Sequence, residues 1–183
     1  MTQIDSKILN QCISGDRNAF RVIVKTYQRM VFSLTLKMLC NEDEAKDMVQ
    51  ETFIKVWQNL PKFDPQKTLS TWIYTIATRL CLDRIKLQKH TYQLPDDDTA
   101  LRNYATHQDG QTELENSEWV QLVTTLTNGL SPKQKLVFTL IQLEGLESSE
   151  VEEITGMDPT QVKSNLYQAR KNIKERLTKL GYE

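Results

Sequence analysis

The sequence predicts an all-α protein of two small helical domains joined by a flexible acidic linker, and three observations support this. Apolar residues recur at three- and four-residue spacing in both halves of the 183-residue chain, without a sustained alternating strand pattern. Residues 91–115 lack this periodicity and contain Pro95, Gly110 and a triple aspartate. Charge is also sorted, because residues 1–90 carry 14 Lys/Arg against 9 Asp/Glu, residues 91–115 carry 1 against 6, and residues 116–183 carry 8 against 9. The predicted domains are therefore 1–90 and 116–183, with 91–115 as the linker.

Composition argues against several classes of protein. A hydrophobic content of 39% is enough for modest cores, and no apolar stretch is long enough to cross a bilayer or to act as a signal peptide. The three cysteines lack metal-ligand spacing. With only two histidines, no phosphate-binding glycine loop and no pairing of nucleophile and base, the sequence disfavours an enzyme. We therefore expect a cytoplasmic protein with no membrane insertion, no metal and no cofactor.

In the first domain, a helix is expected to begin after Asn41, which suits an N-cap, with Glu44 at the third position of a capping box. Its buried stripe comprises Ala45, Met48, Val49, Phe53, Val56 and Trp57. The opposite face carries an acidic, polar and partly apolar strip of Asp47, Gln50, Glu51 and Ile54. Spacing alone leaves two interpretations open, ordinary surface or a docking face for another protein.

A second helix is expected from about Leu69 to His90, after a polar loop over residues 63–70. Its inward residues are Leu69, Ile73, Ile76, Ala77, Leu80 and Leu87. The other side carries Trp72, Thr75, Arg79, Asp83, Lys86 and His90. An aromatic ring among cations suits a surface that stacks unpaired bases and holds phosphates. The alternative is that Trp72 packs in the core.

The last forty-odd residues predict a helix-turn-helix. Val151 and Ile154 give a short apolar stripe, and Gly156 stands where the chain must reverse with positive φ. The next helix starts with Asp158 as N-cap, Pro159 at the first position and Gln161 at the third.

On this last helix, one face is expected to be buried and the other basic. The buried positions are Val162, Leu166, Ala169, Ile173, Leu177 and Leu180. The outward positions include Thr160, Lys163, Ser164, Asn165, Tyr167, Arg170, Lys171 and Lys174. Cations can bind phosphates and short polar side chains can reach base edges, so the motif favours DNA binding over a merely solvated face.

These residues carry a resemblance to a known family. The run NEDEAKDMVQETFIKVWQNLPKFDPQKTLSTWIYTIATRLCLDRIK (41–86), followed by LSPKQKLVFTLIQLEGLESSEVEEITGMDPTQVKSNLYQARKNIKERL (130–177), resembles the extracytoplasmic-function (ECF) sigma factors of bacteria. The likeness begins at GDRNAF (15–20) and reaches almost to the C-terminus. Its most specific parts are DMVQETFIKVW, TWIYTIA and VKSNLYQAR, in the expected order and separation.

The resemblance implies roles for three groups of residues. The strip of Asp47, Gln50, Glu51 and Ile54 would dock on the clamp helices of the largest subunit of RNA polymerase core. The following loop and helix would open the promoter minus-ten element and capture a flipped base, with Phe63, Asp64, Lys67, Ser70, Trp72, Tyr74, Thr75, Arg79 and Lys86 as the DNA-binding residues. The helix-turn-helix would read the minus-thirty-five element in the major groove through Thr160, Gln161, Lys163, Ser164, Asn165, Tyr167, Arg170 and Lys171.

Further partners follow from the same resemblance. The flap of the second-largest polymerase subunit would be a further contact of the chain, and the linker, with Asp96 to Asp98, would thread through a basic channel of polymerase. Members of this family are often held inactive by an anti-sigma factor, which is a candidate partner here. Two positions depart from the family pattern. Arg79 stands where asparagine is common, so we expect it to favour phosphate, and Glu152 stands where a small residue is usual, close to the second helix.

The sequence thus predicts a specificity subunit with two weak DNA readers that polymerase holds at a fixed spacing. With a net charge of −1, the free chain is expected to bind duplex DNA poorly. A conventional DNA-binding regulator would use the same last motif but would gain little from the 47–54 strip or from the surface around Trp72. An adaptor that binds polymerase without reading DNA would tolerate alanine at Lys163 and Arg170.

Overall fold

The computed structural model describes residues 4–91 and 111–179, and within those ranges every regular element is helical. The side chains of residues 4–88 and 119–179 are described. The elements in chain order are α1 (Ser6–Ile13), α2 (Arg17–Leu39), α3 (Glu42–Asn59), η1 (Leu60–Lys62), α4 (Leu69–Thr91), α5 (Gln111–Thr127), α6 (Pro132–Phe138), η3 (Thr139–Leu143), α7 (Ser148–Thr155) and α8 (Pro159–Lys179). The predicted all-α class is confirmed.

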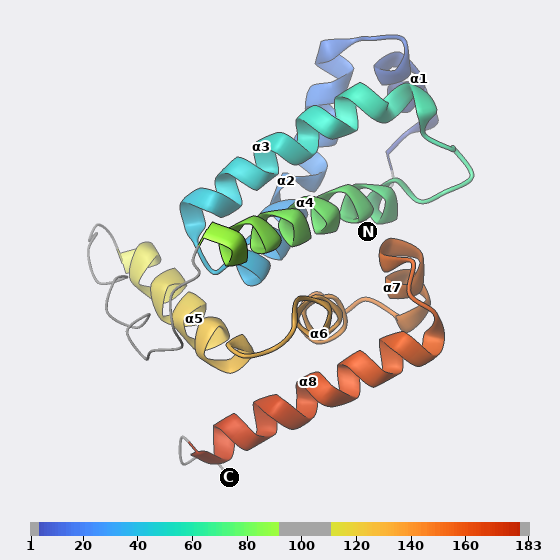
Figure 1. Cartoon of the computed structure of the whole chain (residues 1–183). Helices are drawn as coiled ribbons and strands as arrows, with labels where there is room; N and C mark the ends of the chain where they lie inside the picture. Colours follow the sequence, from blue (N-terminus) through green and yellow to red (C-terminus); the bar gives the residue numbers. More distant parts are fainter. Residues whose placement is uncertain (1–3, 92–110, 180–183) are drawn as a thin grey trace.

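Helices α1 to α4 form an N-terminal bundle in which α2, α3 and α4 pack against one another and α1 lies on α2 (Figure 1). Asp16 caps α2 by accepting hydrogen bonds from the backbone amides of Asn18 and Ala19. Cys40 ends α2 with a left-handed φ of 54°, which lets α3 start after a very short turn. The fully buried side chains at the centre are Ile23, Val31, Leu34, Val56 and Ile73.

Two local expectations in this bundle need adjustment. Asn41 caps α3 by accepting from the Glu44 amide at 2.9 Å, but the Glu44 carboxylate accepts from Gln88 at 2.6 and 2.8 Å on α4 instead of closing the capping box. Leu87, expected in the core, is 63% exposed. The core-facing residue there is Ile85, and a side chain two positions later lies about 200° further around a helix.

Helices α5 to α8 form a C-terminal group. Helix α6 packs against α8, and it ends in η3, a π-helical turn in which the Glu144 amide donates to the Thr139 carbonyl at 2.9 Å. Helix α5 also contacts α8. Because α5 begins at Gln111 and α4 continues to Thr91, residues 111–115 and Thr91 are helical although the sequence assigned them to the linker. The rest of the predicted linker, with Asp96 to Asp98, lies outside the described residues, as does Leu180.

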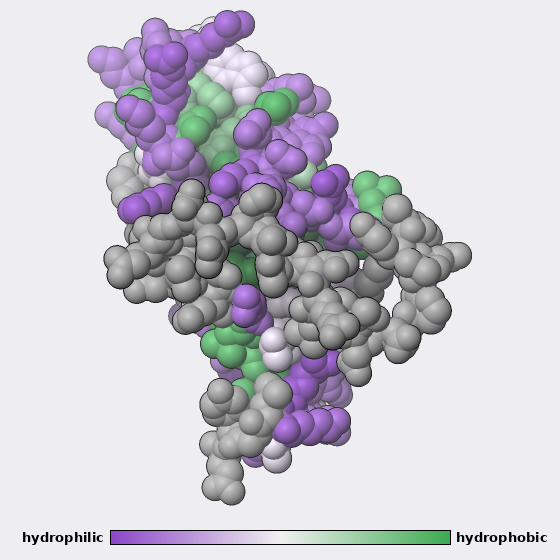
Figure 2. Space-filling view, turned by 90° about the vertical axis from the view of Figure 1, so that its left-hand side faces the viewer, coloured by the Kyte–Doolittle hydropathy of each residue, from purple (hydrophilic) through white to green (hydrophobic). Residues whose placement is uncertain are grey.

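The two groups pack directly against each other. Helix α4 lies between α3 on one side and α6 and α7 on the other, while α8 runs along the far side of the C-terminal group (Figure 1). One hydrophobic cluster extends across this boundary and includes Ala77 and Cys81 of α4 with Leu136, Leu140 and Val151. On the side seen in Figure 2, the described surface is mostly hydrophilic, with hydrophobic residues in small patches. Among the described helices, none has the length and hydropathy needed to cross a membrane.

Candidate functional site

The predicted docking strip lies on the outer face of α3. Asp47, Gln50 and Ile54 are exposed and Glu51 is half-buried, whereas Ala45, Met48 and Val56 on the opposite side are buried. Ile54 is 55% exposed, so the strip presents an apolar side chain to solvent beside its polar residues. A mixed surface of this kind can bind another protein through one apolar contact and a polar rim.

The predicted minus-ten residues lie on two different faces of the folded molecule. Asp64, Lys67, Arg79 and Lys86 are exposed, and Trp72 and Thr75 are half-buried. Within α4, positions 72, 75, 79, 83 and 86 follow three- and four-residue steps and therefore share one face. This face, which we call the α4 outer stripe, keeps its predicted combination of a tryptophan with cations.

Ser70 and Tyr74 lie elsewhere. Their relative exposures are 2% and 3%, and both are about 160° to 200° around α4 from Trp72. They share the opposite stripe with Ala77 and Cys81, which packs on the C-terminal group. The resemblance grouped Ser70 and Tyr74 with Trp72, whereas helical geometry places them on the other side of α4, so in this arrangement they do not share a surface with Trp72.

Phe63 and Trp72 show how the loop meets the helix. Phe63 is buried, and its ring lies 5.0 Å from the Trp72 ring, centroid to centroid, at an interplanar angle of 51°. Phe63 is therefore a packing residue that holds the loop on α4, instead of an exposed DNA contact. Trp72 is half-buried against the core, so it combines both interpretations from the sequence: one part of the indole packs and another part reaches the surface.

The helix-turn-helix forms as expected. Gly156 ends α7 with φ 70°, and its amide donates to the Glu152 carbonyl at 2.8 Å. Asp158 then caps α8, accepting from the Gln161 amide at 2.9 Å, while Gln161 Oε1 accepts from the Asp158 amide at 3.2 Å. Met157 packs back onto the hydrophobic cluster. The turn is fixed by hydrogen bonds of its own, so α8 has a defined direction.

The outward residues of α8 form a single stripe with two exceptions. Thr160, Lys163, Ser164, Tyr167, Arg170, Lys171 and Lys174 are exposed within about 120° of one another around the helix. We call this set the α8 basic stripe, and Tyr167 at its centre is 64% exposed. Gln161 and Asn165 lie on the other flank, where Gln161 completes the cap and the Asn165 amide donates to the Gln161 carbonyl at 2.8 Å.

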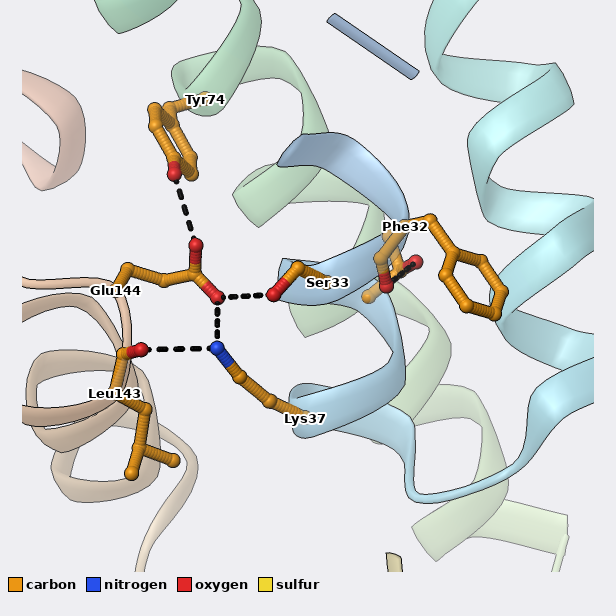
Figure 3. Close-up of polar contacts among 7 residues, drawn as sticks. Phe32, Ser33, Lys37, Tyr74, Leu143 and Glu144 are labelled. Atoms are coloured by element: carbon orange, nitrogen blue, oxygen red, sulfur yellow. Dashed lines mark hydrogen bonds and ion pairs between the residues drawn. The ribbon is translucent and has the colours of Figure 1, made fainter. Parts of the chain in front are cut away.

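A polar cluster that the sequence did not predict joins the two helical groups (Figure 3). Glu144 accepts hydrogen bonds from Ser33 at 2.8 Å and Tyr74 at 3.1 Å, and its carboxylate lies 2.5 Å from Nζ of Lys37. Lys37 also donates to the Leu143 carbonyl at 2.9 Å. Burial, and then the nearby carboxylates of Glu144 and Glu150, raise the pKa of Tyr74 above its usual value. Residues 144–153 contain five glutamates, but nothing in the sequence indicates which of them has a partner in another helix.

The three cysteines are free thiols. Burial raises the pKa of Cys81 to about 12, so this thiol stays protonated at neutral pH. Cys40 is half-buried, and its sulfur accepts from Lys135 at 3.3 Å across the boundary between the groups. Within the part of the chain that the structure describes, no three His, Cys, Asp or Glu side chains are grouped so that they could hold a metal ion.

Comparisons with known proteins agree over nearly the whole chain. The family model of Sigma-70 region 2 matches residues 23–91, and that of Sigma-70 region 4 matches residues 121–173. The chain is 30% identical over 190 residues to the ECF RNA polymerase sigma factor SigW of Bacillus subtilis, covering 98% of this chain and 100% of that protein. It is 26% identical over 185 residues to the ECF RNA polymerase sigma-E factor of Haemophilus influenzae, covering 96% of each.

Solved structures share the fold. The structure of CnrH in complex with the cytosolic domain of CnrY aligns with a TM-score of 0.71 and 19% identity, over 94% of this chain and 96% of that one. The sigma factor RpoE in complex with the anti-sigma factor NepR from Bartonella quintana aligns with a TM-score of 0.66 and 21% identity, over 87% of this chain and 96% of that one. The arrangement of helices is therefore one that solved proteins also adopt.

Proposed function

This chain belongs to the extracytoplasmic-function RNA polymerase sigma factors. From that premise we propose which of its surfaces bind RNA polymerase and which bind promoter DNA. It binds RNA polymerase core, directs the enzyme to specific promoters and helps to open promoter DNA. The observation that carries this conclusion is the match of 98% of the chain, which spans both the α3–α4 region and the helix-turn-helix. We place its action in the cytoplasm, where it would add specificity to polymerase without catalysing a step of its own.

The outer face of α3 is the proposed docking site for the clamp helices of the largest polymerase subunit. Ile54 supplies an exposed apolar anchor, and Asp47, Gln50 and Glu51 supply the polar rim. The C-terminal group is the proposed contact for the flap of the second-largest subunit. With both attachments made, polymerase would hold the two DNA-binding surfaces at a fixed separation, so neither surface needs high affinity alone.

The α4 outer stripe and the neighbouring loop are the proposed minus-ten surface. Asp64 and Lys67 are exposed on the loop, and Trp72, Thr75, Arg79 and Lys86 follow along the helix. The partly exposed indole of Trp72 offers a face on which an unstacked base can lie, and Arg79 and Lys86 offer charge to the backbone. Ser70, Tyr74 and Phe63 are proposed to support this surface from below, since their side chains are buried.

The α8 basic stripe is the proposed minus-thirty-five reader. Its exposed cations suit phosphate contacts and its short polar side chains suit base edges in a major groove that admits one helix. Gln161 and Asn165 are proposed to act through the cap and the helix backbone. Because the solved RpoE relative is bound to an anti-sigma factor, we also propose a protein of that class as an inhibitor of this chain.

Run-off transcription with purified core polymerase on a pool of genomic fragments tests the proposal. We expect the full chain to select a small set of templates that share two sequence elements, and core polymerase alone to select none of them. Selection of the same fragments by the chain without polymerase would identify a conventional DNA-binding regulator. Transcription that is enhanced without any template preference would identify an adaptor.

A further inference from the structure

Helix α2 carries a one-sided charge that the proposed function leaves unused. Its 23 residues include five Lys/Arg and no Asp/Glu. Lys37 is paired with Glu144 inside the molecule, but the four others are exposed. These are Arg17, Arg21, Lys25 and Arg29, which we call the α2 basic stripe.

The spacing of the stripe makes it a continuous surface. Residues four apart on a helix lie about 6 Å apart along its axis and about 40° apart around it, so the four cations follow one gently turning line about 18 Å long. Like charges at this spacing repel and destabilise a helix. Among the described residues, no carboxylate forms an ion pair with any of the four. Asp16, which is next in sequence, is engaged in capping the helix.

The stripe also lies at a particular end of the N-terminal bundle. The first half of α2 packs on the end of α3, where the rings of Phe20 and Trp57 are 4.9 Å apart, centroid to centroid. Helix α1 contacts η1, from which the chain continues through the loop to α4 (Figure 1). Exposed Lys62 and Lys67 belong to this same connection. The stripe is therefore at the same end of the bundle as the loop from which the proposed minus-ten surface begins.

We propose that the α2 basic stripe binds the phosphate backbone of promoter DNA beside the minus-ten element. The inference rests on the proposed function and adds a contact that positions DNA without reading its sequence. A step of about 6 Å along the helix is close to the distance along the duplex axis between alternate phosphates of one strand, about 7 Å. A protein partner is a poorer fit, because the stripe has no aromatic residue and only Val22 as an exposed apolar neighbour.

The variant Lys25→Glu separates DNA binding from folding. A glutamate at this position would face Arg21 and Arg29, each four residues away, and convert two repulsive pairs into attractive ones. We therefore expect the melting temperature to stay equal or rise while DNA binding weakens. A fall in both melting temperature and DNA affinity would show that Lys25→Glu acts through folding. In that case the variants Arg21→Gln and Arg29→Gln test whether the stripe binds DNA.

The decisive measurement is the salt dependence of promoter binding by holoenzyme, reconstituted from core polymerase and the full chain. Each neutralised phosphate contact contributes about 0.9 to the slope of log affinity against log salt. We expect the Arg21→Gln/Lys25→Gln variant to lower the magnitude of that slope by about 2. The affinity of holoenzyme should fall by the same factor for every promoter. The exposed Lys133→Gln variant is the matched control and should leave the slope unchanged. Affinity for core polymerase should also stay unchanged.

Other results would overturn the proposal. An unchanged salt slope would show that the stripe does not contact DNA, and a loss of affinity for core polymerase would assign it to a protein contact. If holoenzyme selected no promoter, the proposed function would fail, and binding of the full chain to mixed-sequence duplex at low salt would then test the stripe. A slope that still falls by about 2 in that assay supports phosphate binding, and an unchanged slope rejects it.

Discussion

The Glu144 carboxylate lies 2.5 Å from Nζ of Lys37, joining residues that are 107 positions apart and belong to different helical groups. The side-chain exposures are only 12% for Lys37 and 8% for Glu144. Ser33 and Tyr74 occupy further positions on the same carboxylate. Such a pair adds little net stability by itself, because taking two charges out of water is costly, but losing one partner leaves a buried charge without compensation.

Replacement of one member of this pair should therefore be more harmful than replacement of both. We expect Glu144→Ala to lower the free energy of unfolding by about 3 kcal/mol, and the double variant Lys37→Met/Glu144→Leu to recover most of that loss. Urea denaturation followed by circular dichroism measures both. If the single and double variants lose equal stability, the pair contributes through packing and the charge argument is wrong.

The Tyr74 hydroxyl gives the protein a dependence on alkaline pH. Burial and nearby carboxylates raise the pKa of folded Tyr74, so its ionisation favours the unfolded chain, where the pKa is about 10. Stability from this group is therefore complete below pH 10 and is lost as the pH rises above that value. At pH 7, we expect Tyr74→Phe to cost about 1.5 kcal/mol through the lost hydrogen bond to Glu144.

Above pH 10 the difference in the free energy of unfolding between wild type and Tyr74→Phe should shrink, because only the wild type has this hydroxyl to ionise. Unfolding curves at pH 7, 9, 10 and 10.5 check the trend. Tyr27→Phe is a useful comparison, since burial also raises the pKa of Tyr27. A gap that stays constant across this range would contradict the assignment to Tyr74.

Thr139 should be replaceable with a gain in stability. Its side chain is fully buried at the start of the π-helical turn, and its hydroxyl has no hydrogen-bond partner. Because an unsatisfied buried hydroxyl costs free energy, we expect Thr139→Val to raise the free energy of unfolding by about 1 kcal/mol.

The control is Thr35, which is equally buried but donates to the Ala45 carbonyl at 3.2 Å and so links α2 to α3. Thr35→Val should lower stability by about 1 kcal/mol. The two substitutions are expected to change the free energy of unfolding in opposite directions, and differential scanning calorimetry can resolve this difference. Two losses of the same size would show that shape, and not the hydroxyl, decides the outcome at both positions.

The contrast between local and long-range features explains what the sequence could predict. Asp158, Gln161 and Gly156 lie within six residues of one another, so their cap and turn follow from residue type and spacing. The contact of Glu144 with Lys37 depends on how two helical groups pack, and no periodicity in either segment encodes it. The candidate minus-ten residues of α4 remain a prediction, and they lie on two different faces of that helix. Tyr74 and Trp72 are only two positions apart, so a resemblance over a whole segment assigns them to one surface. On a helix, however, two residues at this spacing point to nearly opposite sides.

Helix α8 should show the same separation of faces in function. Alanine at Lys163 and Arg170 removes two exposed cations of the α8 basic stripe, and we expect at least a tenfold loss of run-off transcription from promoters that need the upstream element. Lys179→Ala removes one exposed cation from the same helix outside the stripe and should have little effect, whereas Lys163→Ala and Arg170→Ala should each weaken transcription on their own. Asn165→Ala should also be mild, because that side chain donates to its own helix. A strong effect of Asn165→Ala alone would place the reading face on the other flank.

The α3 strip should control affinity for polymerase without affecting the fold. Ile54 is 55% exposed, so Ile54→Asp removes no core contact, but at the centre of a protein interface it would bury an unpaired charge. We expect at least a tenfold loss of affinity for core polymerase, an unchanged melting temperature, and transcription that is restored at high concentration of the variant. Lys55→Ala, an exposed change on the flank of the same helix, is the control. Fluorescence anisotropy of labelled protein titrated with core polymerase measures both. If Ile54→Asp binds core as tightly as the control, polymerase must use a different face of the N-terminal bundle.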